Sequence, residues 1–396
     1  MTEWTECKIS DIGMVVGGAT PSTKKSENYE NGTIAWITPK DLSAFSGRYI
    51  QRGERNITET GLKSCSTQLL PKNTVLFSSR APIGYVAIAA NEVCTNQGFK
   101  SIVPNANTDA LFLYYLLKHN KDKIEGMGSG TTFKEVSGNI MKNIVVSVPT
   151  DKKVQETIAS VLGTIDDKIE ENERINNNLE QQAQAYFDEL FVVNADPNWS
   201  ECTLSDIGSV VAGGTPSKSK PEYYTDQGIA WITPKDLSVN KSKFIFHGEN
   251  DISELGFSKS SATKMPAGTI LFSSRAPIGY IAIAQNEVTT NQGFKSVIPN
   301  ENISTAYMYF LLKNLLPTIE GMASGSTFKE ISGTAMKSVP TVMPDADTIQ
   351  LFSSFCEPVF KEQEILEAEN QRLSAFRDSL LPKLMSGELD VSNIEL

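Results

Sequence analysis

A segment of this chain occurs twice, offset by 195 positions, and this repeat limits the possible folds more than any other feature. The first copy runs from about Trp4 to Pro149, and roughly half of its positions match in the second. The longest shared strings are LFSSRAPIGY (76–85 and 271–280), WITPKDLS (36–43 and 231–238) and NQGFKS (96–101 and 291–296). The offset is far longer than the 20–50 residues of solenoid repeats. The sequence therefore predicts a duplicated domain, as does a length of 396 residues.

Each copy is followed by a segment that predicts a long helix. Residues 151–191 contain almost no Gly or Pro, and a similar pattern recurs at residues 348–381. Apolar and polar residues follow alternating steps of four and three at Ile158, Leu162, Ile165, Ile169, Asn172, Asn176, Leu179, Ala183, Tyr186 and Leu190. This spacing is typical of a coiled-coil seam. Pro382 is expected to end the second helix, because proline cannot continue one.

Two arrangements of these helices are open. The apolar stripes are narrow, which favours packing of the helices on each other over docking of each helix on its own body. In the paired arrangement, polar residues within the seam would fix its register. The candidates for this role are Asn172, Asn176 and Asn370.

The first copy predicts a mixed body of strands and helices. Strands are expected at 34–38, 74–79, 85–90, 99–103 and 143–148, which are rich in β-branched and aromatic residues. Thr108 is expected to cap a helix that runs to about Lys121, with Leu111, Tyr114, Tyr115 and Leu117 on its buried side. Residues 17–22 and 126–132 are expected to be loops. The predicted fold class is α+β, with domains at 1–150, 151–195, 196–345 and 346–396.

The charge of the chain is unevenly distributed. The total is −11, but the two helical segments carry −12 and the two bodies together carry +1. The acidity is thus explained by solvated helix faces, and the bodies are close to neutral. Five cysteines without a CxxC pair indicate a reduced, cytoplasmic protein, and neither a signal peptide nor a membrane-spanning segment is expected.

The sequence lacks the common motifs of catalysis and cofactor binding. It contains no P-loop, no GxGxxG after a strand, no HExxH, no CxxC and no Asp/Asn-Pro-Pro-aromatic string of amino-methyltransferases. The two histidines, His119 and His247, do not correspond under the repeat. Asp41 and Asp236 do correspond, but each stands alone and is better explained as a turn or cap residue than as a catalytic one. No catalytic residue or metal ligand is therefore predicted.

The repeated polar residues instead suit DNA binding. Arginine can bridge two acceptors of a guanine edge or a phosphate, Asn and Gln can bind adenine, and Gly-Ser loops can present N–H groups to phosphate. The candidates are Thr20, Ser22, Lys40, Ser78, Ser79, Arg80, Asn96, Gln97, Ser129, Thr131 and Lys134 in the first copy, and Thr215, Ser217, Lys235, Ser273, Ser274, Arg275, Asn291, Gln292, Ser324, Ser326 and Lys329 in the second. A structural role is open for each of them. Asn96 can cap a turn, and a carboxylate such as Glu92 can hold Arg80.

The order of these parts resembles the specificity subunit of type I restriction-modification enzymes. The resemblance covers nearly the whole chain. It lies in the GGATPS and GGTPS loops, WITPKDLS, SSRAPIGY leading to NQGFKS, the helix QETIASVLGTIDDKIEENERIN, and LLPKLMSGEL at 380–389. The resemblance implies two target-recognition domains that each read one half of a split double-stranded DNA site, separated by an antiparallel coiled coil that sets the spacer. It also implies a scaffold, without catalysis of its own, for two methyltransferase subunits and for restriction–translocase subunits. S-adenosylmethionine, ATP and Mg²⁺ would be bound by those partners.

The likeness of the two copies predicts half-sites that are similar and inverted, so that the target is nearly palindromic. The copies diverge at 44–73 and 239–268, and the half-sites would differ if that stretch reads bases. Three alternatives are a duplicated module that binds carbohydrate or protein, a stand-alone enzyme, and a regulatory decoy that competes for methyltransferase subunits. The missing motifs disfavour the enzyme. A non-DNA module would not need the seam helices, and co-purification of a methyltransferase from the host would separate these classes.

Overall fold

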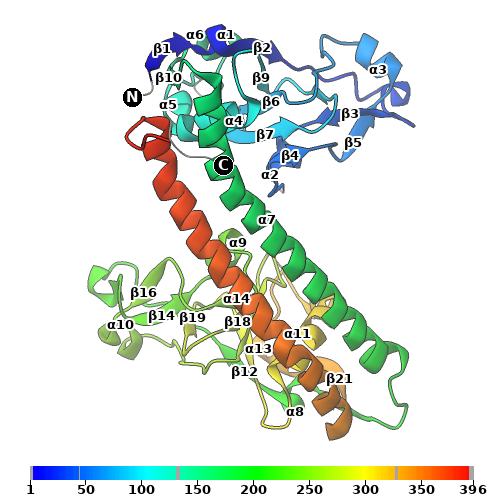
Figure 1. The fold of residues 1–396 in the computed structure, drawn as a ribbon. Coiled ribbons are helices and arrows are strands. Elements are labelled where there is room, and N and C mark those ends of the chain that lie inside the picture. Colours follow the sequence, from blue (N-terminus) through cyan, green and yellow to red (C-terminus); the bar gives the residue numbers. More distant parts are fainter. Residues whose placement is uncertain (1–2, 44, 131–133, 326–328, 392–396) are drawn as a thin grey trace. The chain divides into compact units, whose positions relative to one another are not determined.

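The chain divides into two compact units. The structure, a computed structural model, describes residues 3–43, 45–130, 134–325 and 329–391. Unit 1 comprises residues 1–171 and 371–396, and unit 2 comprises residues 172–370. Each unit thus holds one copy of the repeat and part of each long helix, α7 (Lys152–Asp188) and α14 (Ala346–Met385) (Figure 1). The domain boundaries drawn from composition stay a prediction.

The body of unit 1 combines three small sheets with short helices. Its strands are β1 (Trp4–Lys8), β2 (Gly13–Gly17), β3 (Ile34–Ile37), β4 (Tyr49–Ile50), β5 (Arg55–Ile57), β6 (Val75–Ser79), β7 (Ile83–Ala89), β8 (Cys94–Thr95), β9 (Lys100–Pro104) and β10 (Val145–Pro149). They form sheets in the orders β2-β9-β6-β7-β4, β5-β3-β8 and β1-β10. Its helices are α1 (Ile9–Ile12), α2 (Pro39–Ser43), α3 (Glu59–Lys63), α4 (Ala110–His119), α5 (Lys121–Gly126) and α6 (Gly138–Asn143).

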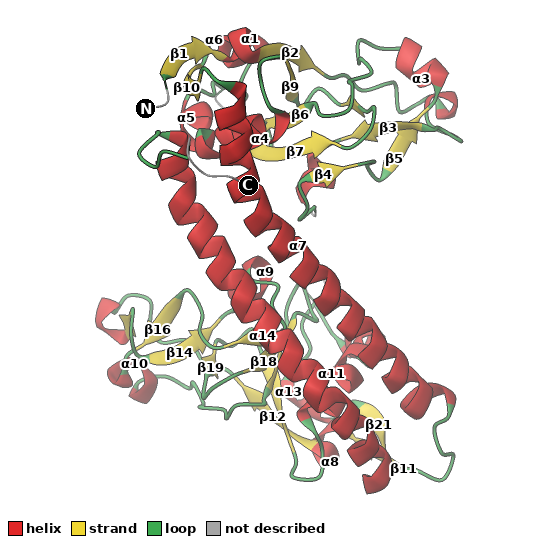
Figure 2. Ribbon diagram, in the orientation of Figure 1, coloured by secondary structure: helices red, strands yellow, loops and turns green. Residues whose placement is uncertain are grey.

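The body of unit 2 repeats this plan, and Figure 2 shows strands and short helices alternating within each body. Its strands are β11 (Ser200–Thr203), β12 (Gly208–Ala212), β13 (Tyr224–Thr225), β14 (Ile229–Ile232), β15 (Phe244–Ile245), β16 (Asn250–Ile252), β17 (Ile270–Phe272), β18 (Ile281–Ala284), β19 (Thr289–Thr290), β20 (Lys295–Pro299) and β21 (Pro340–Met343). The sheet orders are β12-β20-β17-β18-β15, β13-β16-β14-β19 and β11-β21. Its helices are α8 (Leu204–Ile207), α9 (Pro234–Val239), α10 (Glu254–Ser258), α11 (Thr305–Asn314), α12 (Leu316–Met322) and α13 (Gly333–Lys337). The predicted mixture of α and β structure in two similar bodies is confirmed.

The five predicted strands are all present, with ends that shift by one or two residues. Two details of the following helix were wrong. Asp109 rather than Thr108 caps α4, since the Asp109 carboxylate accepts the N–H of Phe112 at 2.8 Å, whereas the Thr108 hydroxyl donates to Asn105. The helix also ends at His119, and α5 begins at Lys121. Helix α4 is buried on nearly all sides, so a single buried face was too narrow a prediction.

Helix α14 continues past the residue that was expected to end it. Pro382 lies inside the helix, which runs to Met385, and Pro358 also lies within it. A proline removes one backbone hydrogen bond from a helix. Burial of Leu384 and Met385 in the core of unit 1 offsets this loss, and the N–H of Ser386 still bonds to the carbonyl of Pro382 at 3.0 Å. Helix α7 ends in a π-helical turn at Glu189–Val193.

Helices α7 and α14 run antiparallel within unit 2. The amide of Asn172 donates to Asn370 Oδ1 at 2.8 Å and to Glu369 at 2.7 Å, and Gln363 donates to the carbonyl of Asn176 at 3.1 Å. Asn172 is fully buried. The predicted pairing through polar seam residues is confirmed for Asn172 and Asn370, whereas Asn176 contributes its backbone rather than its side chain.

Each body is also tied to the helices of its own unit by buried cations. In unit 1, Arg48 is 4% exposed, donates to the carbonyl of Gly163 at 3.2 Å and pairs with Glu170 at 3.0 Å. In unit 2 the corresponding residue, Lys243, donates to Gln363 at 2.7 Å and pairs with Glu180. Pairing of the helices and docking on a body therefore occur together, and in unit 2 the side chain of Gln363 takes part in both.

Candidate nucleic-acid interface

The repeated arginine lies in a charged cluster at the end of a central strand. Arg80 follows β6 and pairs with Glu135 at 3.4 Å, and Lys100 reaches the same carboxylate at 3.1 Å. Glu135 also forms a β-bridge with Arg80 and with Ser129. The alternative that a carboxylate of the body holds Arg80 is confirmed, but the residue is Glu135 rather than Glu92, because backbone pairing brings this carboxylate, 55 positions away, beside the arginine.

The same cluster recurs in unit 2. Arg275 pairs with Glu330 at 3.1 Å, and Lys295 lies 3.7 Å from that carboxylate. The arginine side chains are 35% exposed at Arg80 and 47% at Arg275. Ion pairs this exposed contribute about 1 kcal/mol or less, so a phosphate or a base edge can compete for either guanidinium. Each cluster has two cations for one carboxylate and so carries a net positive charge.

The serines before each arginine hold the turn together. Ser78 donates to the carbonyl of Pro82 and accepts the N–H of Tyr85, both at 2.8 Å, while Ser79 donates to the carbonyl of Gly98 at 3.1 Å. Ser273 and Ser274 make the corresponding bonds, and all four side chains are fully buried. Because these hydroxyls are fully buried, they could touch DNA only if the turn opened. Their contact with DNA stays a prediction.

Four candidates, two exposed and two half-buried, converge on a cleft of about 520 Å³ in unit 2. Its lining includes the candidates Thr215, Lys235, Asn291 and Gln292. Thr215 bonds to Gln292, and the Asn291 carboxamide accepts the N–H of Gly293 at 2.8 Å. The cleft adjoins the arginine cluster, because Gly293 in turn accepts the N–H of Ser274 at 2.7 Å.

Unit 1 holds its counterparts of these residues in the same way. Thr20 bonds to Gln97, and Asn96 accepts the N–H of Gly98 at 2.8 Å. The interpretation of Asn96 as a turn residue is thus confirmed by its carboxamide oxygen. Gln97 is exposed. Contact of Asn96 and Gln97 with DNA stays a prediction.

The lysines beside the cleft make exposed ion pairs. Lys40 pairs with Glu54 at 2.7 Å and Lys235 with Glu249 at 2.6 Å. Hydrogen bonds to these carboxylates raise the pKa of both lysines, which therefore stay charged at neutral pH. Because the pairs lie in solvent, the lysines can exchange their partner for a phosphate.

The duplicated aspartates cap turns, as predicted. Asp41 accepts the backbone N–H of Thr38 at 2.7 Å and that of Glu54 at 2.7 Å. Asp236 makes the corresponding bonds to Thr233 and Glu249. These bonds engage both oxygens of each carboxylate in holding the turn.

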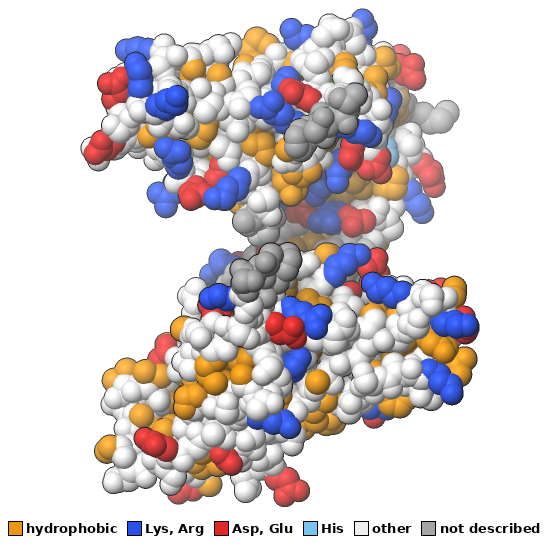
Figure 3. Space-filling view, turned by 180° about the vertical axis from the view of Figure 1, so that it is seen from behind, with side chains coloured by type: hydrophobic (Ala, Val, Ile, Leu, Met, Phe, Trp, Pro, Cys, Tyr) orange, Lys and Arg blue, Asp and Glu red, His pale blue; other side chains and the backbone are white. Residues whose placement is uncertain are grey.

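The remaining candidates lie outside the cleft. Ser129, Lys134, Ser324 and Lys329 are exposed near the arginine clusters, and Ser22 and Ser217 are exposed in the Pro-Ser loops. Thr131 and Ser326 fall outside the described residues. On the face of each unit that Figure 3 shows, basic and acidic side chains are interspersed.

Sequence reasoning missed several residues of the site. The cleft wall is built by Trp231 and Tyr224, whose rings meet edge to face at 5.7 Å, and Trp231 donates its indole N–H to Gly214 at 3.0 Å. Asn250 also lines the cleft, and Glu135 and Glu330 neutralise part of the arginine clusters. Nothing in the sequence separates these residues from the rest of the repeat, because the duplication copied them all.

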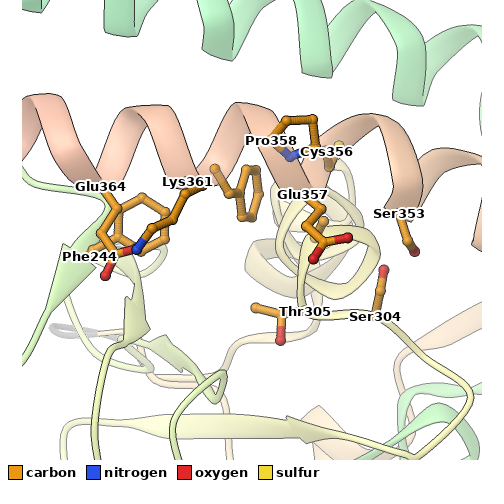
Figure 4. Close-up of a pocket in the computed structure, with 11 residues that line it drawn as sticks. Phe244, Ser304, Thr305, Ser353, Cys356, Glu357, Pro358, Lys361 and Glu364 are labelled. Carbon is orange, nitrogen blue, oxygen red and sulfur yellow. The ribbon is translucent and has the colours of Figure 1, made fainter.

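A larger cavity of about 710 Å³ in unit 2 is mostly apolar and unrelated to these residues. It lies between α14, the start of α11 and Phe244, with Cys356 and Pro358 on its helical wall (Figure 4). In unit 1 the residue that corresponds to Ala306 is Leu111, whose side chain lies beside Gly163 of α7.

Replacing Ala306 with leucine is therefore expected to stabilise unit 2 by about 1 kcal/mol, since the new side chain enters existing space. Chemical denaturation measures the change. The reciprocal variant Leu111→Ala serves as the control and is expected to destabilise unit 1 by about 2 kcal/mol. Destabilisation by Ala306→Leu would show that the cavity cannot hold the leucine that unit 1 accommodates.

The described part of the chain contains neither a helix suited to cross a membrane nor a cluster of potential metal ligands. All five cysteines are unpaired.

Comparison with known proteins decides the family. The model of the type I restriction modification DNA specificity domain matches residues 1–181 and again residues 197–375. The chain belongs to this family. It is 34% identical to the type I restriction enzyme MjaIX specificity subunit of Methanocaldococcus jannaschii, over 99% of this chain and 95% of that one.

Two further relatives agree with this assignment. The HindI specificity subunit of Haemophilus influenzae is 23% identical over 98% of this chain and its own full length. The crystal structure of the S subunit of a type I restriction-modification system from M. genitalium superposes with a TM-score of 0.61 at 18% identity, covering 97% of this chain and 96% of that one. This member of the specificity family therefore has a role in DNA targeting, and the double match coincides with the internal repeat.

Proposed function

We propose that this chain directs a type I restriction-modification complex to a bipartite DNA site, with one half read by each body. The observation that carries the proposal is the surface of unit 2, in which a polar cleft adjoins an arginine cluster with excess positive charge, and the recurrence of that cluster in unit 1. Arg, Asn, Gln and Lys side chains are the usual ligands of base edges and phosphates. Family membership supports the assignment of this surface to DNA.

The chain would act without catalysis of its own in the cytoplasm. Two methyltransferase subunits would assemble on it and supply S-adenosylmethionine chemistry, and restriction–translocase subunits would supply ATP- and Mg²⁺-dependent cleavage. The paired helices α7 and α14 would set the spacer between the half-sites. The likeness of the two bodies favours half-sites that are similar and inverted.

Co-purification from the native host, followed by mapping of methylated bases in its genome, tests this proposal. A methyltransferase should co-purify, and the methylated motif should contain two related, inverted half-sites around an unread spacer. The purified chain alone should neither transfer methyl groups nor cleave DNA. Two unrelated half-sites would contradict the symmetric arrangement, and recovery of the chain without any methyltransferase would contradict the assembly role.

Replacing Arg80 and Arg275 with alanine tests the arginine clusters. In the assembled complex, the double variant is expected to bind specific DNA at least tenfold more weakly, and its affinity should depend less steeply on salt. Fluorescence anisotropy over a salt series measures both effects. The matched control is Lys63→Ala, an exposed cation outside the cluster. Unchanged DNA binding with a lowered melting temperature would instead assign the arginines a structural role.

A further inference from the structure

The residues that line the cleft of unit 2 recur almost unchanged at the corresponding positions of unit 1. Twelve residues line the cleft of unit 2, and all but two of them have the same residue 195 positions earlier. The exceptions are Lys218, which corresponds to Thr23, and Asn250, which corresponds to Arg55. If these residues read DNA, a difference between the two half-sites must therefore come from these two positions or from residues outside this set.

Arg55 and Asn250 occupy the same place in the fold. Arg55 begins β5 and pairs in register with Trp36 of β3, and Asn250 begins β16 and pairs in register with Trp231 of β14. Both side chains are exposed. The residues before them, Glu54 and Glu249, make equivalent ion pairs, so the surroundings of the two positions match.

The guanidinium of Arg55 is positioned by an aromatic ring rather than by a carboxylate. It lies 4.1 Å from the centre of the Tyr29 ring and makes no ion pair with any described residue. Stacking on a ring orients the planar guanidinium and leaves its N–H donors at the edge. An arginine held in this way is suited to bind a planar group with two adjacent hydrogen-bond acceptors, such as the edge of a guanine.

The two side chains differ in the base that each recognises best. Arginine donates two hydrogen bonds to O6 and N7 of guanine, whereas asparagine donates to N7 and accepts from N6 of adenine. At the other exception, Lys218 is a flexible point charge in an exposed loop, which suits a phosphate without regard to sequence.

We propose that Arg55 and Asn250 determine a sequence difference between the half-sites: Arg55 reads a guanine, and Asn250 reads an adenine at the corresponding position of the other half. The inference rests on the proposed function, because it requires each cleft to face DNA. It predicts a target that is palindromic except at this position, where the two halves carry different purines.

The test exchanges the two residues in the full chain, assembled with its methyltransferase subunits. The wild type, Arg55→Asn, Asn250→Arg and the double exchange are each used to select bound sequences from a randomised DNA library. Arg55→Asn should change the preferred base of one half-site from guanine to adenine, with a tenfold to hundredfold change in discrimination. Asn250→Arg should do the reverse, and the double exchange should restore a wild-type motif in inverted orientation.

Thr23→Lys is the matched control and should alter affinity without altering the motif. If Arg55→Asn weakens binding to all sequences equally, Arg55 contacts phosphate and the inference is wrong. It is also wrong if the variant selects the wild-type motif at wild-type affinity. Failure of the wild-type complex to select any bipartite motif would instead overturn the proposed function, so the two failures are distinguishable.

Discussion

Replacing Asp166 with alanine is expected to lower the free energy of unfolding of unit 1 by about 3 kcal/mol. Asp166 is 5% exposed, and its carboxylate accepts the Tyr115 hydroxyl at 2.6 Å and a guanidinium N–H of Arg377 at 2.7 Å. Burial and the neighbouring carboxylate raise the pKa of Tyr115 well above its ordinary value, so the phenol remains a donor. Without Asp166, the buried Tyr115 hydroxyl loses its acceptor and Arg377 retains the 64% exposed Asp378 as a partner, and removal of one member of such a buried network typically costs about 3 kcal/mol.

Urea denaturation measures this loss, and hydrogen exchange locates it. Protection should fall in unit 1 and remain unchanged in unit 2. Asp167→Ala is the control, because Asp167 also pairs with a cation but is 70% exposed, and a loss below about 1 kcal/mol is expected. Equal stability of the two variants would show that the pair between Asp166 of α7 and Arg377 of α14 does not stabilise unit 1.

The second large effect is expected from Trp231→Ala, which should destabilise unit 2 by about 3 kcal/mol or more. Trp231 is 6% exposed and supports the cleft through its contact with Tyr224 and its bond to Gly214. Truncation of a buried tryptophan removes this packing and leaves the Gly214 carbonyl without its donor. Denaturation followed by hydrogen exchange measures the effect in each unit.

Trp36→Ala makes the corresponding change in unit 1 and provides an internal comparison, since Trp36 is 5% exposed and bonds to Ala19 at 3.1 Å. If each body reads one half-site, each variant should relax recognition of one half only. Trp231→Phe should retain most of the packing and lose about 1 kcal/mol through the missing indole N–H. A loss of recognition at both halves by either single variant would argue against independent reading.

Much of the fold could be predicted because its signals are local. The strands of the first body and both long helices follow from side-chain periodicity, and the seam role of Asn172 follows from heptad spacing. The errors arose where tertiary packing overrides a local rule. Pro382 does not end α14 because Leu384 and Met385 are buried beyond it. Asp109 caps α4 because Asn105 already engages Thr108.

The site was less predictable, since the type of a residue does not reveal its exposure. Ser78 and Ser79 have suitable hydroxyls for DNA, yet both are buried in the turn. The carboxylate beside Arg80 could not be identified, because a β-bridge to Glu135 depends on how distant segments pair. Lys235 and Gln292 are exposed, but their convergence with Trp231 and Tyr224 in one cleft depends on the folded sheet.

The division of the chain into units has a consequence for its synthesis on the ribosome. Unit 2 is continuous in sequence, whereas unit 1 combines residues 1–171 with residues 371–396. The core of unit 1 includes Leu384 and Met385, which are translated near the end of the chain. The body made first must therefore wait, with part of its apolar surface uncovered, until the body made second has left the exit tunnel. Unit 1, whose first residues are made before unit 2, is therefore expected to complete its folding after unit 2. A chain that ends after residue 370 would contain all residues of unit 2 but only part of unit 1.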